Sequence, residues 1–113
     1  MKFNFSELTE PERISFLQRF ILIHSYLYYE MDTNIISDQK YDAAARQLTT
    51  MQQDFDLSAT DYGYVFDEFT GVTGFDLFSK LNDKDKDLIK DLARRIERNY
   101  KDSQYGTKSN NKV

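Results

Sequence analysis

Aromatic rings and carboxylates gather in one short stretch of the 113-residue sequence, between positions 24 and 48. Tyr28 and Tyr29 close a run of apolar and aromatic residues, and Asp38, Tyr41 and Asp42 follow after a short polar connection. The second group stands at i, i+3 and i+4, so its members share one face if the segment is helical. Ring faces attract flat cations, and carboxylates accept paired hydrogen bonds from vicinal hydroxyls. The stretch therefore favours a ligand that offers both groups.

Nicotinamide mononucleotide (NMN) is such a ligand, because it carries a positively charged pyridinium ring and a ribose diol. The free amides of a helix that begins near Asp38 could receive its phosphate. We therefore expect NMN, or the NMN half of NAD, as the ligand. The structural alternative is that Tyr28 and Tyr41 pack in a core, Asp38 caps a helix and Asp42 is solvated. His24 is expected to be a packed or capping histidine and not an acid or base.

Two helices must position these residues. Thr9-Glu10-Pro11-Glu12 predicts a capping box with Pro in the first turn, and apolar residues then recur at spacings of three and four, so we expect a helix over about 10–31. After a turn cluster, Ser37 is a typical N-cap and predicts a second helix over about 38–54. The short link makes the two helices an antiparallel hairpin, which brings the tyrosine pair close to the second group.

The rest of the chain is expected to complete an all-α fold. Residues 55–81 are irregular and predict short helical turns and a Gly-rich loop. Asn82 precedes a last amphipathic helix over about 83–101, and the polar residues 103–113 are expected to form a flexible tail. We predict a single domain over 1–102. The aromatic residues of the irregular segment are expected to cover the hairpin and not to stack a ligand: Tyr62, Tyr64, Phe66, Phe69 and Phe75.

Composition excludes several classes of function. The sequence has no Cys and one His, so we expect no disulfide framework and no metal site. A net charge of −4 disfavours binding of nucleic acid by the domain as a whole. No apolar run approaches the roughly 20 residues of a membrane span, and the first residues lack the pattern of a signal peptide. We therefore expect a cytoplasmic protein that does not enter a membrane.

The same stretch also resembles a known family. Tyr26–Tyr29, the connection 32–37 and the segment 38–48 resemble the small N-terminal helical domain, domain Ia, of bacterial NAD-dependent DNA ligases. In that family this domain grips the NMN half of NAD while a neighbouring domain takes the adenylate. Asn34 stands where the family usually has Pro, which should loosen the turn without removing a contacting residue. The resemblance implies five NMN-contacting residues: Tyr28, Tyr29, Asp38, Tyr41 and Asp42.

The resemblance does not extend to catalysis. A ligase needs an adenylation domain with a nucleophilic Lys in a Lys-x-Asp-Gly motif, and modules that encircle DNA. Lys40-Tyr41-Asp42-Ala43 lacks the Gly and falls within a predicted helix, so we expect no independent ligase activity. We assign no catalytic residue and no required cofactor, with NMN or NAD only as a ligand. Size and resemblance favour a free-standing module of phage or mobile-element origin.

Three functional hypotheses follow. The first is a non-catalytic domain Ia-like module that binds NMN, NAD or a related nucleotide. The second is a phage or mobile-element regulator that reuses the fold to bind and inhibit a host protein, which an exposed aromatic patch within 62–75 would favour. The third is an enzyme that cleaves the nicotinamide bond, with Asp38 or Asp42 as acid or base.

Overall fold

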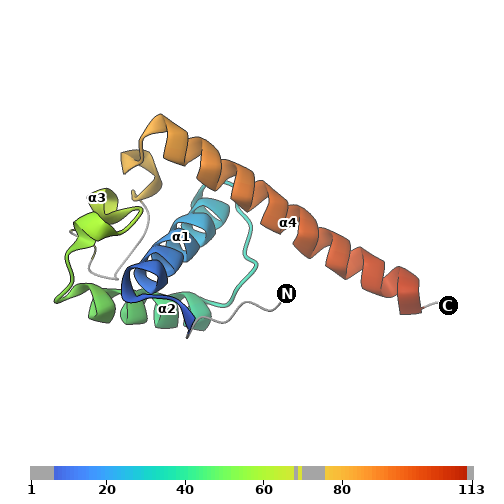
Figure 1. Ribbon diagram of the computed structural model, residues 1–113. Coiled ribbons are helices and arrows are strands. Elements are labelled where there is room, and N and C mark those ends of the chain that lie inside the picture. The colour runs from blue at the N-terminus through green and yellow to red at the C-terminus, as the bar shows by residue number, and fades with distance from the viewer. Residues whose placement is uncertain (1–6, 68, 70–75, 112–113) are drawn as a thin grey trace.

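The computed structural model describes residues 7–67, 69 and 76–111, with side chains described up to residue 103. Within these residues every regular element is helical, so the predicted all-α fold is confirmed (Figure 1). The elements follow one another along the chain as α1 (Glu10–Tyr29), α2 (Asp38–Gln52), the 3-10 turn η2 (Leu57–Ala59), α3 (Gly63–Phe66), the 3-10 turn η3 (Phe78–Lys80) and α4 (Asp83–Asn111).

Helix α1 lies at the centre, and both α2 and α4 pack on it (Figure 1). Its predicted capping box is formed: the Thr9 amide donates to Glu12 Oε1 at 2.8 Å, and the Glu12 amide donates to Thr9 Oγ1 at 3.4 Å. Because neighbours cover α1 on more than one side, its buried apolar residues spread around the helix: Ile14, Leu17, Ile21, Leu22, Ile23 and Leu27.

Helix α2 completes the predicted hairpin with α1. Ser37 is its N-cap, since Ser37 Oγ accepts a hydrogen bond from the Lys40 amide at 3.1 Å, and Ala45 and Leu48 are buried. Both helices end slightly earlier than predicted, at Tyr29 and at Gln52. The cause at α1 is a turn with Asp32 at a φ of 49°, in the left-handed region that ends a helix abruptly.

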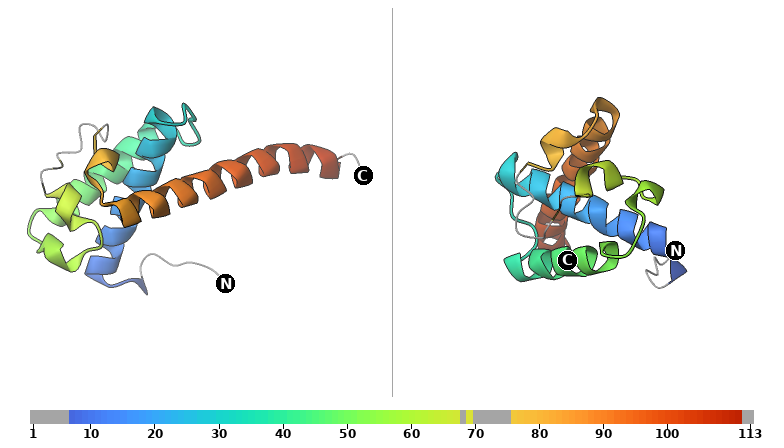
Figure 2. Two further views of the ribbon diagram at one scale, coloured as in Figure 1. Left: turned by 90° about the horizontal axis from the view of Figure 1, so that it is seen from above. Right: turned by 90° about the vertical axis from the view of Figure 1, so that its left-hand side faces the viewer.

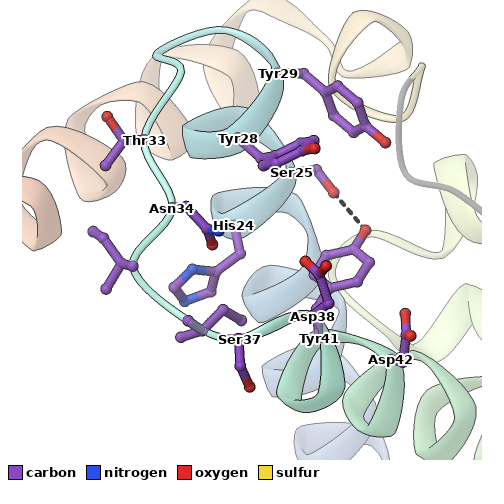
Figure 3. A pocket seen from close by; sticks show the side chains of 12 residues that line it. His24, Ser25, Tyr28, Tyr29, Thr33, Asn34, Ser37, Asp38, Tyr41 and Asp42 are labelled. Atoms are coloured by element: carbon purple, nitrogen blue, oxygen red, sulfur yellow. Dashed lines mark hydrogen bonds between the residues drawn. The ribbon is translucent and has the colours of Figure 1, made fainter.

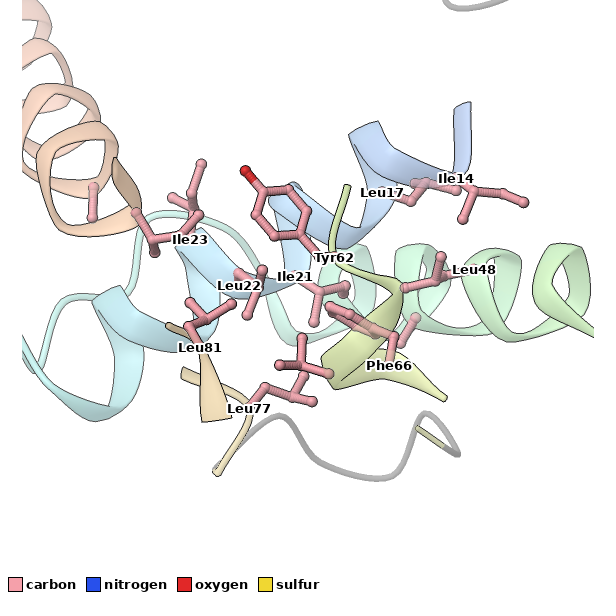
Figure 4. Close-up of a cluster of buried hydrophobic side chains, with 14 of the residues drawn as sticks. Ile14, Leu17, Ile21, Leu22, Ile23, Leu48, Tyr62, Phe66, Leu77 and Leu81 are labelled. Atoms are coloured by element: carbon pink, nitrogen blue, oxygen red, sulfur yellow. The ribbon is translucent and has the colours of Figure 1, made fainter. Parts of the chain in front are cut away.

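The segment between the hairpin and α4 supplies part of the core. Tyr62 and Phe66 are buried against α1, as predicted (Figure 4). Phe69 packs edge-on against Phe66 with 5.1 Å between ring centroids. Tyr64 instead points outward and donates a hydrogen bond to Asp85 Oδ2 at 2.6 Å. Phe75 lies outside the described residues. Most of the described aromatic residues of this segment therefore belong to the core and not to an exposed patch.

Helix α4 begins at the predicted cap, where Asn82 Oδ1 accepts from the Asp85 amide at 2.8 Å. Ile89 and Ala93, in the first turns of α4, are buried in the core. The later turns project beyond the other helices (Figure 2). The helix ends at Asn111 and not near 101, where the apolar spacing on which the prediction rested stops. A flexible tail over 103–113 stays a prediction. Among the described helices, none is both long and apolar enough to cross a membrane.

One fully buried polar side chain joins three parts of the fold. Gln18 Nε2 donates to Gln52 Oε1 at 3.0 Å and to Thr60 Oγ1 at 3.1 Å, and Gln18 Oε1 accepts from the Tyr62 amide at 3.2 Å. These bonds tie α1 to the end of α2 and to the residues that precede α3. A buried amide of this kind is tolerated because its donors and its acceptor are paired.

Replacement of this amide should destabilise the fold. Gln18→Leu keeps the side-chain size but leaves the Tyr62 amide buried without its acceptor, which costs about 1–3 kcal/mol of unfolding free energy. Gln47→Leu, at an exposed position of α2, is the matched control and should change stability by less than about 0.5 kcal/mol. Urea denaturation of both variants measures the difference, and equal stabilities would contradict the role of Gln18.

Candidate functional site

A pocket of about 280 Å³ lies where the end of α1 meets the start of α2 (Figure 3). The link between the two helices forms its third side. All five residues predicted from the sequence line it. The full lining consists of His24, Ser25, Tyr28, Tyr29, Thr33, Asn34, Ile35, Ile36, Ser37, Asp38, Tyr41 and Asp42.

Two tyrosine rings from the last turn of α1 form the rim of the pocket. Tyr28 is 53% exposed and Tyr29 is 41% exposed, so neither side chain belongs to the core. Their rings meet edge to face, with centroids 4.9 Å apart and planes at 85°. Both side chains are therefore partly exposed at the rim, where their ring surface can contact a flat ligand.

Tyr41 is held in the pocket by a residue that was not predicted as part of the site. Ser25 Oγ and Tyr41 Oη lie 2.7 Å apart in a hydrogen bond between α1 and α2 (Figure 3). Burial raises the pKa of the Tyr41 phenol above its ordinary value, so the hydroxyl stays protonated. Ser25 precedes Tyr28 and Tyr29 by three and four positions, a spacing that places it on their face and could have identified it.

The two carboxylates stand on the first turns of α2 and are exposed. Ser37, and not Asp38, supplies the side chain that caps the helix, so the capping role in the structural alternative is wrong. In the part of the chain that the structure describes, neither Asp38 nor Asp42 forms a hydrogen bond or ion pair. Their oxygen atoms are therefore available to hydroxyl donors and to a cation.

The link contributes Ile35 and Ile36 as apolar lining, and His24 of α1 also lines the pocket. The His24 ring lies against Phe20, with centroids 4.5 Å apart, which agrees with the expected packed histidine. Burial lowers the pKa of His24 below its ordinary value of 6.5, so the ring is neutral at physiological pH. No group of three potential metal-ligating side chains occurs within the described ranges.

The lowered pKa of His24 predicts a pH dependence of stability. Because His24 binds a proton less readily in the folded than in the unfolded protein, the free energy of unfolding is highest above pH 6.5. It decreases as the pH falls from 6.5 through the pKa of the folded state. Between about pH 7 and pH 5, the wild type should therefore lose stability more steeply than His24→Gln, which has no titrating ring. Urea denaturation midpoints across this range measure the effect, and parallel curves would contradict it.

Comparison with known proteins identifies the segment that holds this pocket. Residues 7–61 match the family model described as DNA ligase-like, N-terminal NAD+-binding domain. A DNA ligase of Lawsonia intracellularis is 44% identical over 46 residues, which cover 41% of this chain and 7% of that protein. A DNA ligase of Pelotomaculum thermopropionicum is 31% identical over 93 residues, covering 75% of this chain and 14% of that protein.

The match is confined to a small part of those relatives. The chain spans 7% and 14% of the length of the two ligases. No solved structure matches it. The matched segment contains α1, the link and α2, and with them every residue that lines the pocket. Residues 7–61, which hold the whole pocket, are thus similar to DNA ligase-like, N-terminal NAD+-binding domains.

Proposed function

We propose that the pocket binds NMN, either free or as the NMN half of NAD+, and that the chain acts as a nucleotide-binding module without chemistry of its own. The observation that carries this proposal is the convergence of five residues from two helices on one pocket: Tyr28, Tyr29, Asp38, Tyr41 and Asp42. The match of residues 7–61 to a family of NAD+-binding domains supports the same ligand class.

The size of the pocket favours half of a dinucleotide over the whole. Its volume of about 280 Å³ lies just below the ~300–1,000 Å³ that is typical of small-molecule sites. A mononucleotide matches such a space, whereas the adenylate half of NAD+ would extend into solvent or onto another protein surface. Affinity should accordingly reside in the nicotinamide end of the ligand.

Each part of NMN has a chemical counterpart in the pocket. The tyrosine rings offer faces to the pyridinium cation, and the two negative carboxylates add a favourable field for the same charge. A carboxylate also accepts paired hydrogen bonds from the ribose diol. Asp38 and Gln39 are the first residues of α2, where backbone amides have no acceptor within the helix and suit the phosphate.

Binding without catalysis is favoured because the sequence holds no Lys-x-Asp-Gly motif. The segment Lys40-Tyr41-Asp42-Ala43, which partly resembles this motif, lies inside α2 and is helical. Origin in a phage or mobile element stays a prediction, and so does inhibition of a host protein. Tyr62 and Phe66 are buried, so they are not part of an exposed aromatic patch through which such an inhibitor would bind its target.

Calorimetric titration of the full chain tests the ligand. NMN and NAD+ should bind with similar affinity, because both present the oxidised ring to the pocket. NADH should bind more weakly, since its dihydronicotinamide ring carries no positive charge, and AMP should not bind. Absence of NMN binding at millimolar concentration, or equal binding of AMP, would contradict the proposal. Chromatography of the NAD+ sample for free nicotinamide tests the hypothesis of bond cleavage.

Substitutions in the pocket test the residues. Asp38→Asn should weaken NMN binding by about tenfold or more, because a charge-assisted hydrogen bond contributes about 1.5–3 kcal/mol. Asp54→Asn removes the same charge just beyond α2, outside the pocket lining, and should leave the affinity unchanged. Tyr28→Leu should weaken binding several-fold, with Tyr100→Leu on α4 as its control. Equal affinities in pocket and control variants would exclude this site.

A further inference from the structure

The link that walls the pocket is held from outside by α4. Thr33 is one of the lining residues, and its hydroxyl donates a hydrogen bond to Glu97 Oε2 at 2.9 Å. Figure 3 shows Thr33 on the link beside the pocket. Glu97 belongs to α4, which lies beyond the segment 7–61 that matches the family. A part of the chain outside the matched segment thus touches the wall of the candidate site.

The surroundings of Glu97 favour a persistent bond. Its side chain is only 21% exposed, and Lys101 Nζ lies 3.6 Å from the same carboxylate oxygen. The Thr33 hydroxyl also lies 3.0 Å from the Met31 carbonyl oxygen. A hydroxyl has a single proton, and an ionised carboxylate is a stronger acceptor than a neutral carbonyl group.

The link is irregular, and its apolar residues Met31 and Ile35 pack against the core. No helix or strand spans positions 30–37. After the left-handed Asp32, the Thr33 amide donates to the Leu27 carbonyl at 2.8 Å, which fixes the start of the link to α1. Helix α4 is a firm support, because Ile89 and Ala93 are fully buried in the core. The contact with Glu97 therefore joins an irregular segment of the pocket lining to a well-anchored helix.

We propose that Glu97 is a positioning residue, through which α4 braces the pocket wall at Thr33 and sets the affinity for NMN. This inference rests on the proposed function and extends the binding unit beyond the family segment. The coupling is reciprocal, so NMN should also slow amide exchange at Thr33 and around Glu97.

Calorimetry with NMN on full-length variants tests the brace. Glu97→Ala and Thr33→Val should each weaken NMN binding by about fivefold or more, the lower end of typical coupling between sites. The double variant should bind no more weakly than either single variant, because both remove the same hydrogen bond. Wild-type affinity in both single variants would overturn the proposal, and so would additive losses.

Conservative substitutions separate positioning from stability. Thr33→Ser keeps the hydroxyl and should bind NMN within about twofold of the wild type, whereas Glu97→Gln keeps only a neutral acceptor and should bind with an affinity between those of the wild type and Glu97→Ala. Lys101→Gln removes the ion pair but leaves the hydrogen bond, so it should also bind NMN within about twofold of the wild type. Thermal unfolding of each variant is measured in parallel. If NMN affinity across these variants correlates with their melting temperatures and not with the presence of the Thr33–Glu97 hydrogen bond, Glu97 has only a structural role and the proposal fails.

Amide exchange without ligand separates this inference from the proposed function. In Glu97→Ala, the Thr33 amide should exchange faster than in the wild type, whether or not NMN binds. Unchanged exchange would overturn the brace even if the wild type binds NMN. If exchange is faster but the wild type does not bind NMN, the contact between Glu97 and Thr33 stabilises the link, and NMN is rejected as the ligand.

Discussion

The burial of α1 on more than one side is the constraint on which the rest of the structure depends. Its aliphatic side chains face α2 in one direction and α4 in another, and each fully buried residue such as Ile14 or Ile21 contributes about 1.5–3 kcal/mol. A helix of this kind is stable only when neighbours cover it. The chain therefore turns back after Tyr29, and α2 begins beside the end of α1.

The pocket is a consequence of that return. Apolar packing along α1 gives way to polar groups in its last two turns, where Ser25 meets Tyr41 and the exposed tyrosine pair follows. The first turns of α2 bring carboxylates and backbone amides to the same place. A recognition site for a cation with hydroxyl groups thus lies at the edge of the core, where helix ends leave polar groups without partners.

Local interactions could be predicted from the sequence. The capping box at Thr9 and the N-cap at Ser37 depend on residues within one turn, and a short link was enough to bring the five site residues together. Helical spacing also distinguishes buried from exposed residues in the segment around α3. Tyr62, Val65 and Phe66 stand at i, i+3 and i+4 and are buried, whereas Tyr64 points outward. Aromatic residue type alone does not make this distinction.

Contacts between distant positions could not be predicted. Ser25 and Tyr41 are 16 positions apart, and Thr33 and Glu97 are 64 apart, so neither pair leaves a periodic pattern. Each requires the mutual placement of helices that only the packed core defines. The length of α4 was missed for a related reason, since the sequence beyond residue 101 follows no apolar spacing.

The most direct test of the account is a crystal structure of the full chain with NMN. The account predicts the nicotinamide ring against the tyrosine rings of the pocket, and the ribose hydroxyls within hydrogen-bond distance of Asp38 or Asp42. Density for NMN elsewhere on the surface, or an empty pocket at saturating NMN, would contradict it.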